Sequence, residues 1–542
     1  METYKQSSSD VSSQNREQQL GKSAALISVL VIISRITGFI RTWAQAYALG
    51  ATVIASCYSV ANNLPNQLYE LVIGGMLVTA FLPVYLSVKK KSGIHHASEY
   101  ASNLTSIVAI LMAAVTVIGF IFAGQVVYTQ SFSARSDFDT ALAVYFFKFF
   151  VIEVLLYALS SIFSGILNAE RDYFWSSAAP IFNNFVTIAS FLAYAFLVNS
   201  YPVAALIILA LGNPLGVLIQ VVLQIPSLIK QGIRLRFHVD LKDPALKDTL
   251  SIGIPSLVVM VGSFVTVSVQ TSSALSVCAE GASIAFYARL WYTLPYAILA
   301  VPITTAMFTE LSYDIAKHDM RSYCAGIQTG TQKILFLMIP FSLFLIMYAL
   351  PLVHLMAAGK FNPQQLQDTA LYLAGLAVSL PAYGVCMYLQ KICSSLRTMK
   401  YYAFSTLVAS LIQVAFCIYL TPLFGLCMVA LSSSVMFVVV DTLTFIMLFS
   451  RLRGLSLLSF VLSCFRAFIC GLAGAVVGGF IFWLSGHGAL LYDSSLTVSL
   501  ALVLGVLILS GVPALVVTFG FAWVFHMPEI DFIRSLVHKK QL

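Results

Sequence analysis

The segment SRITGFIR (residues 34–41) places two arginines inside the first long apolar stretch of the chain, which covers residues 22–48. No acidic residue from position 18 to position 69 is present to neutralise Arg35 and Arg41. An uncompensated cation deep in a bilayer is costly, so such residues normally face a watery cavity or an anionic ligand. If residues 22–48 cross a membrane, we expect this helix to face an anionic ligand.

The composition indicates a membrane protein with many spans. Apolar residues make up 59% of the 542 residues and charged residues 10%, against roughly 45–50% and about 25% in ordinary soluble domains. Residues 1–20 are polar and rich in Ser and Gln, and no small-residue cleavage site follows, so we expect a cytoplasmic tail that stays on the chain. The sequence therefore predicts an all-α polytopic membrane protein.

Charged and turn-rich clusters divide the chain into fourteen expected transmembrane helices. Each has at least the roughly 20 residues that cross the hydrocarbon core. Residues 173–229 contain no charge, and we divide them at 199–202. The expected helices cover residues 22–48, 52–88, 98–128, 138–167, 174–198, 202–229, 247–274, 281–313, 324–356, 365–395, 401–421, 424–450, 457–485 and 495–525.

The loop charges support this division. With the N-terminus inside, the cytoplasmic loops collect the basic clusters, such as residues 89–91 and 230–247, whereas the outer loops hold Arg135 and Lys360. This alternation fits an even number of spans with both termini in the cytoplasm. Topology and anionic lipid headgroups then explain the net charge of +8, and we predict no nucleic-acid partner.

The two halves of the chain look alike. The second span of each half carries a Leu-Pro step, at Leu64-Pro65 and Leu294-Pro295, although chance could place two such pairs in an apolar chain. Many transporters build a central site from matched bundles with interrupted helices. We therefore expect two six-helix lobes around a central cavity plus two extra C-terminal helices, divided as residues 21–237 (helices 1–6), 238–455 (helices 7–12), 456–526 (helices 13–14) and a cytoplasmic tail at 527–542.

Several short motifs are shared with one family of transporters. They are SRITGFIR itself, NLPN at 63–66, the pair at 74–75, AFLP at 80–83, and YARL at 287–290 followed by Pro295. In these motifs the chain resembles the MurJ/MviN family of bacterial lipid II flippases, which belongs to the multidrug, oligosaccharidyl-lipid and polysaccharide (MOP) exporter superfamily. The YEL form at residues 69–71 is similar to that of high-GC Gram-positive relatives.

The resemblance implies a substrate and a mechanism. Family members carry lipid II, the undecaprenyl-pyrophosphate-linked disaccharide pentapeptide, from the inner to the outer leaflet of the bacterial cytoplasmic membrane by alternating access. Arg41 and Arg289 match the cavity arginines that hold the pyrophosphate, and Arg35 matches another functional arginine. The last two helices would form a groove for the polyprenyl tail, and small residues at 471–475 and 478–479 would either line it or brace the second lobe.

The chain also departs from the family pattern. Tyr69 stands where the family has an arginine, and Ser56 and Thr42 stand where it has acidic residues. Glu70 could line the cavity beside Tyr69, or could cap or pair where the helix is interrupted. Asp441 is the one acid of the twelfth span, so ion binding and a polar interhelical contact are both open there, and sodium coupling is not predicted.

The chemistry of arginine agrees with an anionic headgroup, because a guanidinium matches phosphate oxygens bidentately. Arg35 and Arg41 lie about 9 Å apart along a helix and about 120° apart around it. Either the cavity is wide or the helix bends at Gly38. The alternative is that these long side chains snorkel toward the membrane surface. In the fourth span, Lys148 and Glu153 are five residues apart, and we expect them to form an ion pair.

Motifs for catalysis are lacking in the sequence. It contains no nucleophile motif, Walker loop or zinc spacing, and its nine cysteines follow no disulfide or metal pattern. We predict a monomeric transporter rather than an enzyme, without cofactor or metal, whose partners are lipid II, membrane lipids and possible cell-wall synthesis proteins. The alternatives are a flippase for another undecaprenyl-linked oligosaccharide, a cation-coupled multidrug exporter, which would want acids in its cavity, and a membrane scaffold without transport.

Overall fold

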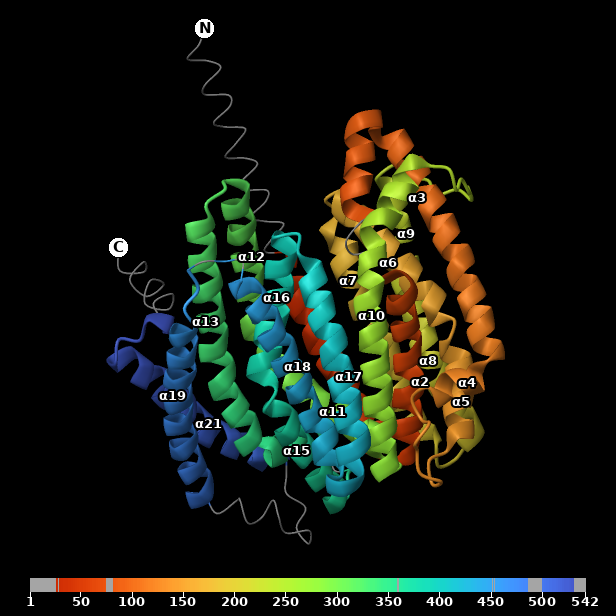
Figure 1. Cartoon of the computed structure of the whole chain (residues 1–542). Helices are drawn as coiled ribbons and strands as arrows, with labels where there is room; N and C mark the ends of the chain where they lie inside the picture. Colours follow the sequence, from red (N-terminus) through yellow and green to blue (C-terminus); the bar gives the residue numbers. More distant parts are fainter. Residues whose placement is uncertain are drawn as a thin grey trace. The chain divides into compact units, whose positions relative to one another are not determined.

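The computed structural model describes residues 26–27, 29–74, 81–357, 360–450, 452, 454–485 and 500–530, with the backbone alone at 73–74 and 247–258. Within these residues the regular secondary structure is helical and includes no strand (Figure 1). The all-α class predicted from the composition is therefore confirmed.

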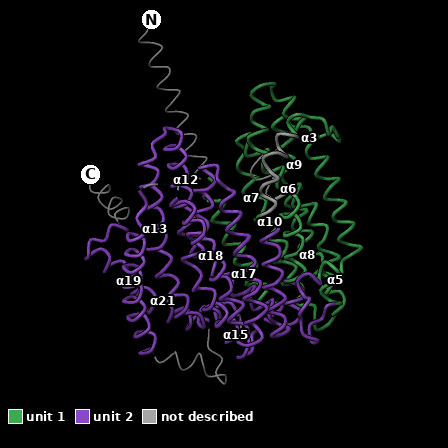
Figure 2. The backbone as a smooth tube through the Cα atoms, in the orientation of Figure 1, with its two compact units in different colours: residues 1–48, 60–127, 141–260 green, residues 49–59, 128–140, 261–542 purple. Residues whose placement is uncertain are grey.

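The chain forms two compact units, coloured separately in Figure 2. Unit 1 comprises residues 1–48, 60–127 and 141–260, and unit 2 comprises residues 49–59, 128–140 and 261–542. The two units exchange short segments along the sequence, so neither is one continuous stretch of chain. The four-part division at residues 237, 455 and 526 that the sequence suggests stays a prediction.

Unit 1 is built from a first helix at residues 29–49 and a series of helices that follow it. These are the part of α2 (Val53–Tyr69) from residue 60 onward, a π-helical turn (Glu70–Gly74), α3 (Leu82–Ile121), α4 (Ala123–Tyr128), α5 (Thr140–Phe150), α6 (Glu153–Ala169), α7 (Tyr173–Leu197), α8 (Pro202–Val222), α9 (Ile225–Lys230) and the first part of α10 (Pro244–Val277). Residues 53–59 of α2 belong to unit 2. α7 and α8 separate at the uncharged break expected at 199–202, where Pro202 begins α8 because its missing N–H costs nothing at a helix start.

Small residues bring α7 and α8 into close contact. A Cβ atom added at Gly212 would lie 2.1 Å from Ser190 Oγ, and one at Gly216 would lie 2.3 Å from Asn183 Oδ1. Ser190 Oγ also donates a 2.8 Å hydrogen bond to the carbonyl oxygen of Ile208. Small residues that let backbones approach, combined with interhelical hydrogen bonds, are the usual means of helix association in membranes.

Unit 2 contains the rest of α10 and the helices that follow it. These are α11 (Gly281–Pro295), a π-helical turn (Tyr296–Ala300), α12 (Val301–Ala316), α13 (Met320–Met347), α14 (Ala349–Ala357), α15 (Pro363–Ala377), α16 (Leu380–Ser395), α17 (Met399–Phe424), α18 (Leu426–Phe449), α19 (Leu457–Leu484), α21 (Leu500–Val524) and a 3₁₀ turn (Pro528–Ile530).

The structure confirms a multi-pass protein but not the count of fourteen spans. Eleven described helices are long and apolar enough to cross a membrane, and the pair α15 and α16, bent by 48°, makes twelve if counted as one span. The break expected between the helices at 52–88 and 98–128 is present as a sharp kink within α3 at Gly93, whose φ of +84° and ψ of 179° are non-helical and suit glycine alone. The first of these two expected helices is divided further, because α2 ends at a π turn.

Both Leu-Pro steps precede a π-helical turn. Pro65 lies inside α2, shortly before the turn Glu70–Gly74, and Pro295 ends α11 immediately before the turn Tyr296–Ala300. A proline inside a helix removes one backbone hydrogen bond and pushes against the preceding turn. Single π turns within helices are rare and occur often at functional sites.

The two C-terminal helices pack on each other through glycine. A Cβ atom at Gly474 of α19 would lie 2.0 Å from Thr518 Oγ1 of α21, and one at Gly478 would lie 2.8 Å from Ala514 Cβ. These glycines therefore sit in a tight helix contact rather than along an open groove. The choice between a packing brace and a groove for the polyprenyl tail in helices α19 and α21 stays a prediction.

Candidate functional site

The first helix is held against α7 near its arginines. Asn184 Nδ2 donates hydrogen bonds to Thr37 Oγ1 at 2.9 Å and to the Ser34 carbonyl oxygen at 3.3 Å. Residues 29–49 stay helical throughout, so the expected bend at Gly38 does not interrupt the helix. A Cβ at Gly38 would come 3.8 Å from Asn184 Nδ2, which is an ordinary contact. Arg35 is exposed on this helix.

Arg41 is half-buried and lies within electrostatic range of Glu153, a fully buried acid at the start of α6. The two carboxylate oxygens of Glu153 accept hydrogen bonds of 3.0 and 2.9 Å from Asn213 Nδ2, and the Tyr157 hydroxyl also bonds to it. Asn213 Nδ2 lies 2.5 Å from Asn62 Oδ1 as well. A buried charge persists only where hydrogen bonds and an opposite charge compensate it. We call Arg41, Glu153, Tyr157, Asn213 and Asn62 the polar cluster.

The ion pair expected between Lys148 and Glu153 is wrong. Lys148 Nζ lies over the Phe120 ring, 5.7 Å from its centroid. The helix is interrupted at residues 151–152, between α5 and α6, so the two side chains no longer lie on one continuous helix. The partner of Glu153 is Asn213, which lies 60 residues away in the sequence. An acid and an asparagine inside apolar helices are the signal that could have pointed to this contact.

Tyr69 and Glu70 lie at the end of α2, at the π turn. The hydroxyl of Tyr69 bonds to Ser161, and its ring centroid lies 6.3 Å from that of Tyr157, which connects it to the polar cluster. Glu70 is exposed, and its Oε1 accepts a 3.3 Å hydrogen bond from Asn66 Nδ2. The structure therefore brings Tyr69 toward Arg41 through Tyr157, while Glu70 makes the local contact that was the alternative to lining a cavity.

A cavity of about 440 Å³ lies beside these residues in unit 1. Its walls come from α2, α3, α6, α8 and the residue preceding α3. We call it the hydroxyl cavity, because its polar lining is formed by Tyr69, Tyr157, Ser160, Ser161, Ser164, Asn168 and Gln220. The sequence analysis identified only Tyr69 among these residues, since single serines in apolar helices give no strong signal.

Arg289 lies on α11 in unit 2. Its side chain is exposed and hydrogen-bonds the hydroxyl of Tyr372, a residue of α15 that is 1% exposed. Within the described residues no carboxylate forms an ion pair with Arg289. One turn further along α11, the Tyr292 hydroxyl lies 2.7 Å from Ser379 Oγ. Arg289 is thus a cation in an apolar helix with a neutral hydrogen-bond partner.

Asp441 on α18 is buried, with 9% of its surface exposed. Its Oδ1 accepts no hydrogen bond from any group that the structure describes. The described residues contain no group of three His, Cys, Asp or Glu side chains that could hold a metal ion. Its role as an ion site or as a polar interhelical contact therefore stays a prediction.

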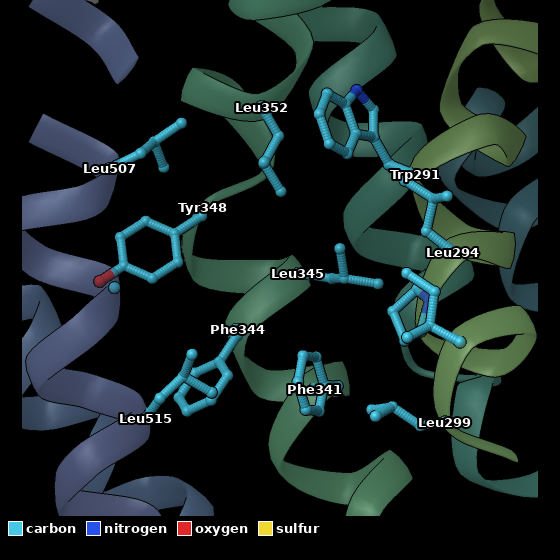
Figure 3. A pocket seen from close by; sticks show the side chains of 13 residues that line it. Trp291, Leu294, Leu299, Phe341, Phe344, Leu345, Tyr348, Leu352, Leu507 and Leu515 are labelled. Carbon is cyan, nitrogen blue, oxygen red and sulfur yellow. The ribbon is translucent and has the colours of Figure 1, made fainter. Parts of the chain in front are cut away.

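An apolar pocket of about 310 Å³ lies in unit 2, bounded by α11, α13 and α21 (Figure 3). Leu507 and Leu515 of α21 point toward Phe344 of α13 and toward Tyr348 at the C-terminal end of α13. Trp291 approaches the pocket from α11. The lining also includes Gly511, where an added Cβ would meet nothing within 4 Å. The spacing of Leu507, Gly511 and Leu515 at intervals of four places them on one face of α21. This pocket was not predicted from the sequence, and the groove suggested at residues 471–475 and 478–479 stays a prediction.

Comparison of sequences finds proteins named as lipid II flippases. The family model described as lipid II flippase MurJ matches residues 45–502. A protein of Borreliella burgdorferi named "Probable lipid II flippase MurJ" is 25% identical over 420 residues, which cover 77% of this chain and 81% of that protein. The protein of Burkholderia cenocepacia named "Lipid II flippase MurJ" is 26% identical over 369 residues, covering 67% of this chain and 70% of its own.

Solved structures share the fold. "Lipid II flippase MurJ, inward closed conformation" aligns with a TM-score of 0.72 and 18% identity, covering 92% of this chain and 99% of that chain. An inward-facing multidrug resistance MATE family transporter of the MOP superfamily aligns with a TM-score of 0.63 and 13% identity over 82% of this chain and 98% of its own. Because the family model spans most of its residues, this chain belongs to the MurJ family of lipid II flippases.

Proposed function

We propose that this protein carries lipid II from the inner to the outer leaflet of a bacterial cytoplasmic membrane. The observation that supports this most is the combination of the family match with two arginines, Arg41 and Arg289, in apolar helices. Lipid II has the pyrophosphate anion that such residues need. The loop charges support cytoplasmic termini, and the chain acts as a transporter without cofactor and not as an enzyme.

The arginines would bind and release the pyrophosphate as the protein changes conformation. Each guanidinium presents a planar fork of donors to phosphate oxygens at any physiological pH. Glu153 would hold Arg41 in place between substrates, because it is fixed by Asn213 and lies within electrostatic range of the guanidinium. Transport by alternating access could draw on the membrane potential, which offers about 2.3 kcal/mol per elementary charge per 100 mV.

The apolar pocket of unit 2 is the place we assign to part of the undecaprenyl tail (Figure 3). Its lining of leucine, phenylalanine and tryptophan side chains offers apolar surface, whereas the glycines between α19 and α21 leave no space. This assignment moves the tail site from the α19–α21 contact expected from the sequence to the pocket that α21 shares with α11 and α13.

The test of the proposed function is replacement of a host flippase. In a bacterium whose own lipid II flippase is depleted, this protein should restore growth and the amount of lipid II in the outer leaflet. The variant with both Arg41 and Arg289 changed to Ala, expressed and inserted equally, is the control and should restore neither. Accumulation of lipid II in the inner leaflet despite normal insertion of the unchanged protein would contradict the proposal.

Two other transport functions are less well supported. A multidrug resistance transporter of the MATE family shares the fold. A cation-coupled multidrug exporter would need an acid available to a cationic drug, but Glu153 is fully buried and already hydrogen-bonded. A flippase for another undecaprenyl-linked glycan would use the same arginines. Restoration of that glycan but not of lipid II would identify it.

A further inference from the structure

The hydroxyl cavity in unit 1 has a lining that suits a neutral, polar ligand. None of the described side chains that line it is charged, and its polar atoms are hydroxyls and amides. Its volume of about 440 Å³ lies within the roughly 300–1,000 Å³ of small-molecule sites. Such a lining offers hydrogen bonds in both directions without attracting an ion, so the pyrophosphate itself has no reason to enter it.

The polar groups of the cavity are held in place by α8. Gln220 Nε2 donates to Ser160 Oγ at 2.8 Å, and Gln220 Oε1 accepts from Asn183 Nδ2 at 3.1 Å. Gln224 Nε2 also donates to Ser160 Oγ, at 2.9 Å, and Gln224 Oε1 accepts from Ser164 Oγ at 3.0 Å. Because Ser160 Oγ accepts twice, its own hydrogen is left to donate. Side chains fixed in this way lose little conformational entropy when a ligand binds.

Two tyrosines form one wall of the cavity. The ring planes of Tyr69 and Tyr157 are inclined by 44° with centroids 6.3 Å apart, and the Tyr69 hydroxyl bonds to Ser161. Tyrosine combines an apolar ring face with a polar tip. A wall of this kind next to fixed hydroxyls and amides matches a sugar ring, which has C–H faces and a rim of hydroxyl and amide groups.

Tyr157 joins the cavity to the polar cluster. Tyr157 lines the cavity, while its hydroxyl bonds to Glu153, the acid within electrostatic range of Arg41. In lipid II the sugars follow directly after the pyrophosphate. A pyrophosphate at Arg41 would therefore bring the first sugar toward Tyr157.

We propose that the hydroxyl cavity binds the uncharged, amide-bearing sugar part of the headgroup while Arg41 holds the pyrophosphate. The proposal rests on the proposed function, since it needs a pyrophosphate-linked sugar as substrate. It makes Tyr69, Ser161 and Gln220 residues that distinguish a glycan headgroup from a bare pyrophosphate. They would thus set specificity, whereas Arg41 and Arg289 supply affinity for any anionic head.

Binding of two lipids to the purified full chain tests the proposal. The probes are lipid II and undecaprenyl pyrophosphate, which shares the tail and the pyrophosphate but lacks the sugars and peptide. Ser161→Leu fills the cavity, and Gln220→Met removes the amide that orders it while keeping a similar volume. Matched controls outside the cavity are Ser312→Leu, at an exposed serine of α12, and Gln332→Met, whose Nε2 donates to Ser459 Oγ at 2.7 Å.

We expect Ser161→Leu to weaken lipid II binding about tenfold, and Gln220→Met several-fold, as the loss of one or two hydrogen bonds implies. Undecaprenyl pyrophosphate should bind both variants within about twofold of the unchanged protein, because it makes no use of the cavity. The two controls should bind both lipids normally.

Three results would overturn the inference. Equal losses for the two lipids would show that the substitutions distort the unit, no loss for either would show that the cavity holds only water, and equal affinity of the unchanged protein for both lipids would show that the sugars make no contact. Failure of the unchanged protein to bind either lipid is a different outcome, because it would contradict the proposed function itself.

Discussion

Arg41 and Arg289 carry the same charge in apolar helices, but the side chains around the two guanidinium groups differ. Arg41 lies within electrostatic range of Glu153, which is fully buried and bonded to Asn213. Arg289 bonds to the neutral hydroxyl of Tyr372 and has no ion pair among the described residues. An acid near a buried cation can stabilise it when no ligand is bound, whereas a cation with only neutral partners has no such support. The comparison predicts that the empty site is better tolerated around Arg41 than around Arg289.

The largest effect is expected when Arg41 is changed to Ala. The change removes a charge-assisted contact to the pyrophosphate and leaves the Glu153 carboxylate to repel it. Binding of undecaprenyl pyrophosphate should fall more than about a hundredfold, from about 2–5 kcal/mol for the lost partner plus the repulsion. Titration of the purified variant with this lipid measures it.

A second change in the same background sharpens the comparison. Adding Glu153→Gln to Arg41→Ala keeps the hydrogen bonds to Asn213 and removes the repelling charge, so part of the binding should return. If the double variant binds no better than Arg41→Ala, Glu153 carries no charge that the ligand senses, and the contrast between the two units fails.

The next largest effect is expected at Arg289. Changing it to Ala should weaken binding of the same lipid at least about thirtyfold. This corresponds to about 2 kcal/mol, the lower end of the cost of removing one partner of a charge pair. Lys should restore only part, because it keeps the charge and loses the planar fork. Both variants should match the unchanged protein in expression and thermal midpoint, since Arg289 stabilises the ligand more than the empty protein. A large drop in thermal midpoint would instead assign Arg289 a structural role through Tyr372.

Much of the fold could be predicted from the sequence because it depends on local properties. Apolar length predicts membrane helices, and Pro202 marks a helix start even where no charge helps. The lysines at 89–91 likewise predicted the break that lies at Gly93, but not that helical residues would continue on both sides of it without a loop. Whether a polar stretch ends a helix depends on what packs around it.

The site was predicted less completely because its contacts join distant parts of the chain. The arginines could be found, since a charge in an apolar helix is unusual wherever it lies. The partner of Glu153 could not, because Lys148 is near in sequence and Asn213 is near in space. Likewise, small residues allow either a groove or a close contact, and the position of Thr518 beside Gly474 could not be predicted from the sequence.

A smaller effect should separate the apolar pocket of unit 2 from the glycine contact. Gly511→Leu fills the pocket, so it should weaken binding of undecaprenyl-linked lipid II several-fold, by the loss of about one buried methylene contact at about 0.8 kcal/mol, and leave binding of a short-chain analogue unaffected. Gly474→Leu should lower the thermal midpoint, because its side chain meets Thr518 and Ala514, and should not distinguish the two chain lengths. Chain-length discrimination by Gly474→Leu alone would return the tail site to the α19–α21 contact.

The smallest effect is expected at Asp319, an exposed charge that serves as the reference for the intramembrane ones. Asp319 caps α13, accepting hydrogen bonds from the Ser322 backbone N–H at 3.0 Å and hydroxyl at 2.8 Å, and these bonds lower its pKa. A lowered pKa contributes stability that is present above the unfolded value of about 3.9 and is lost as the pH falls through the folded value. Asp319→Ala should therefore lower the thermal midpoint slightly at pH 7, with the difference shrinking below about pH 4, and should leave lipid II binding unchanged. A loss of binding as large as that at Arg289 would mean that removing any charge from this protein impairs lipid II binding. The effects at Arg41 and Arg289 would then give no evidence that these two arginines bind the substrate.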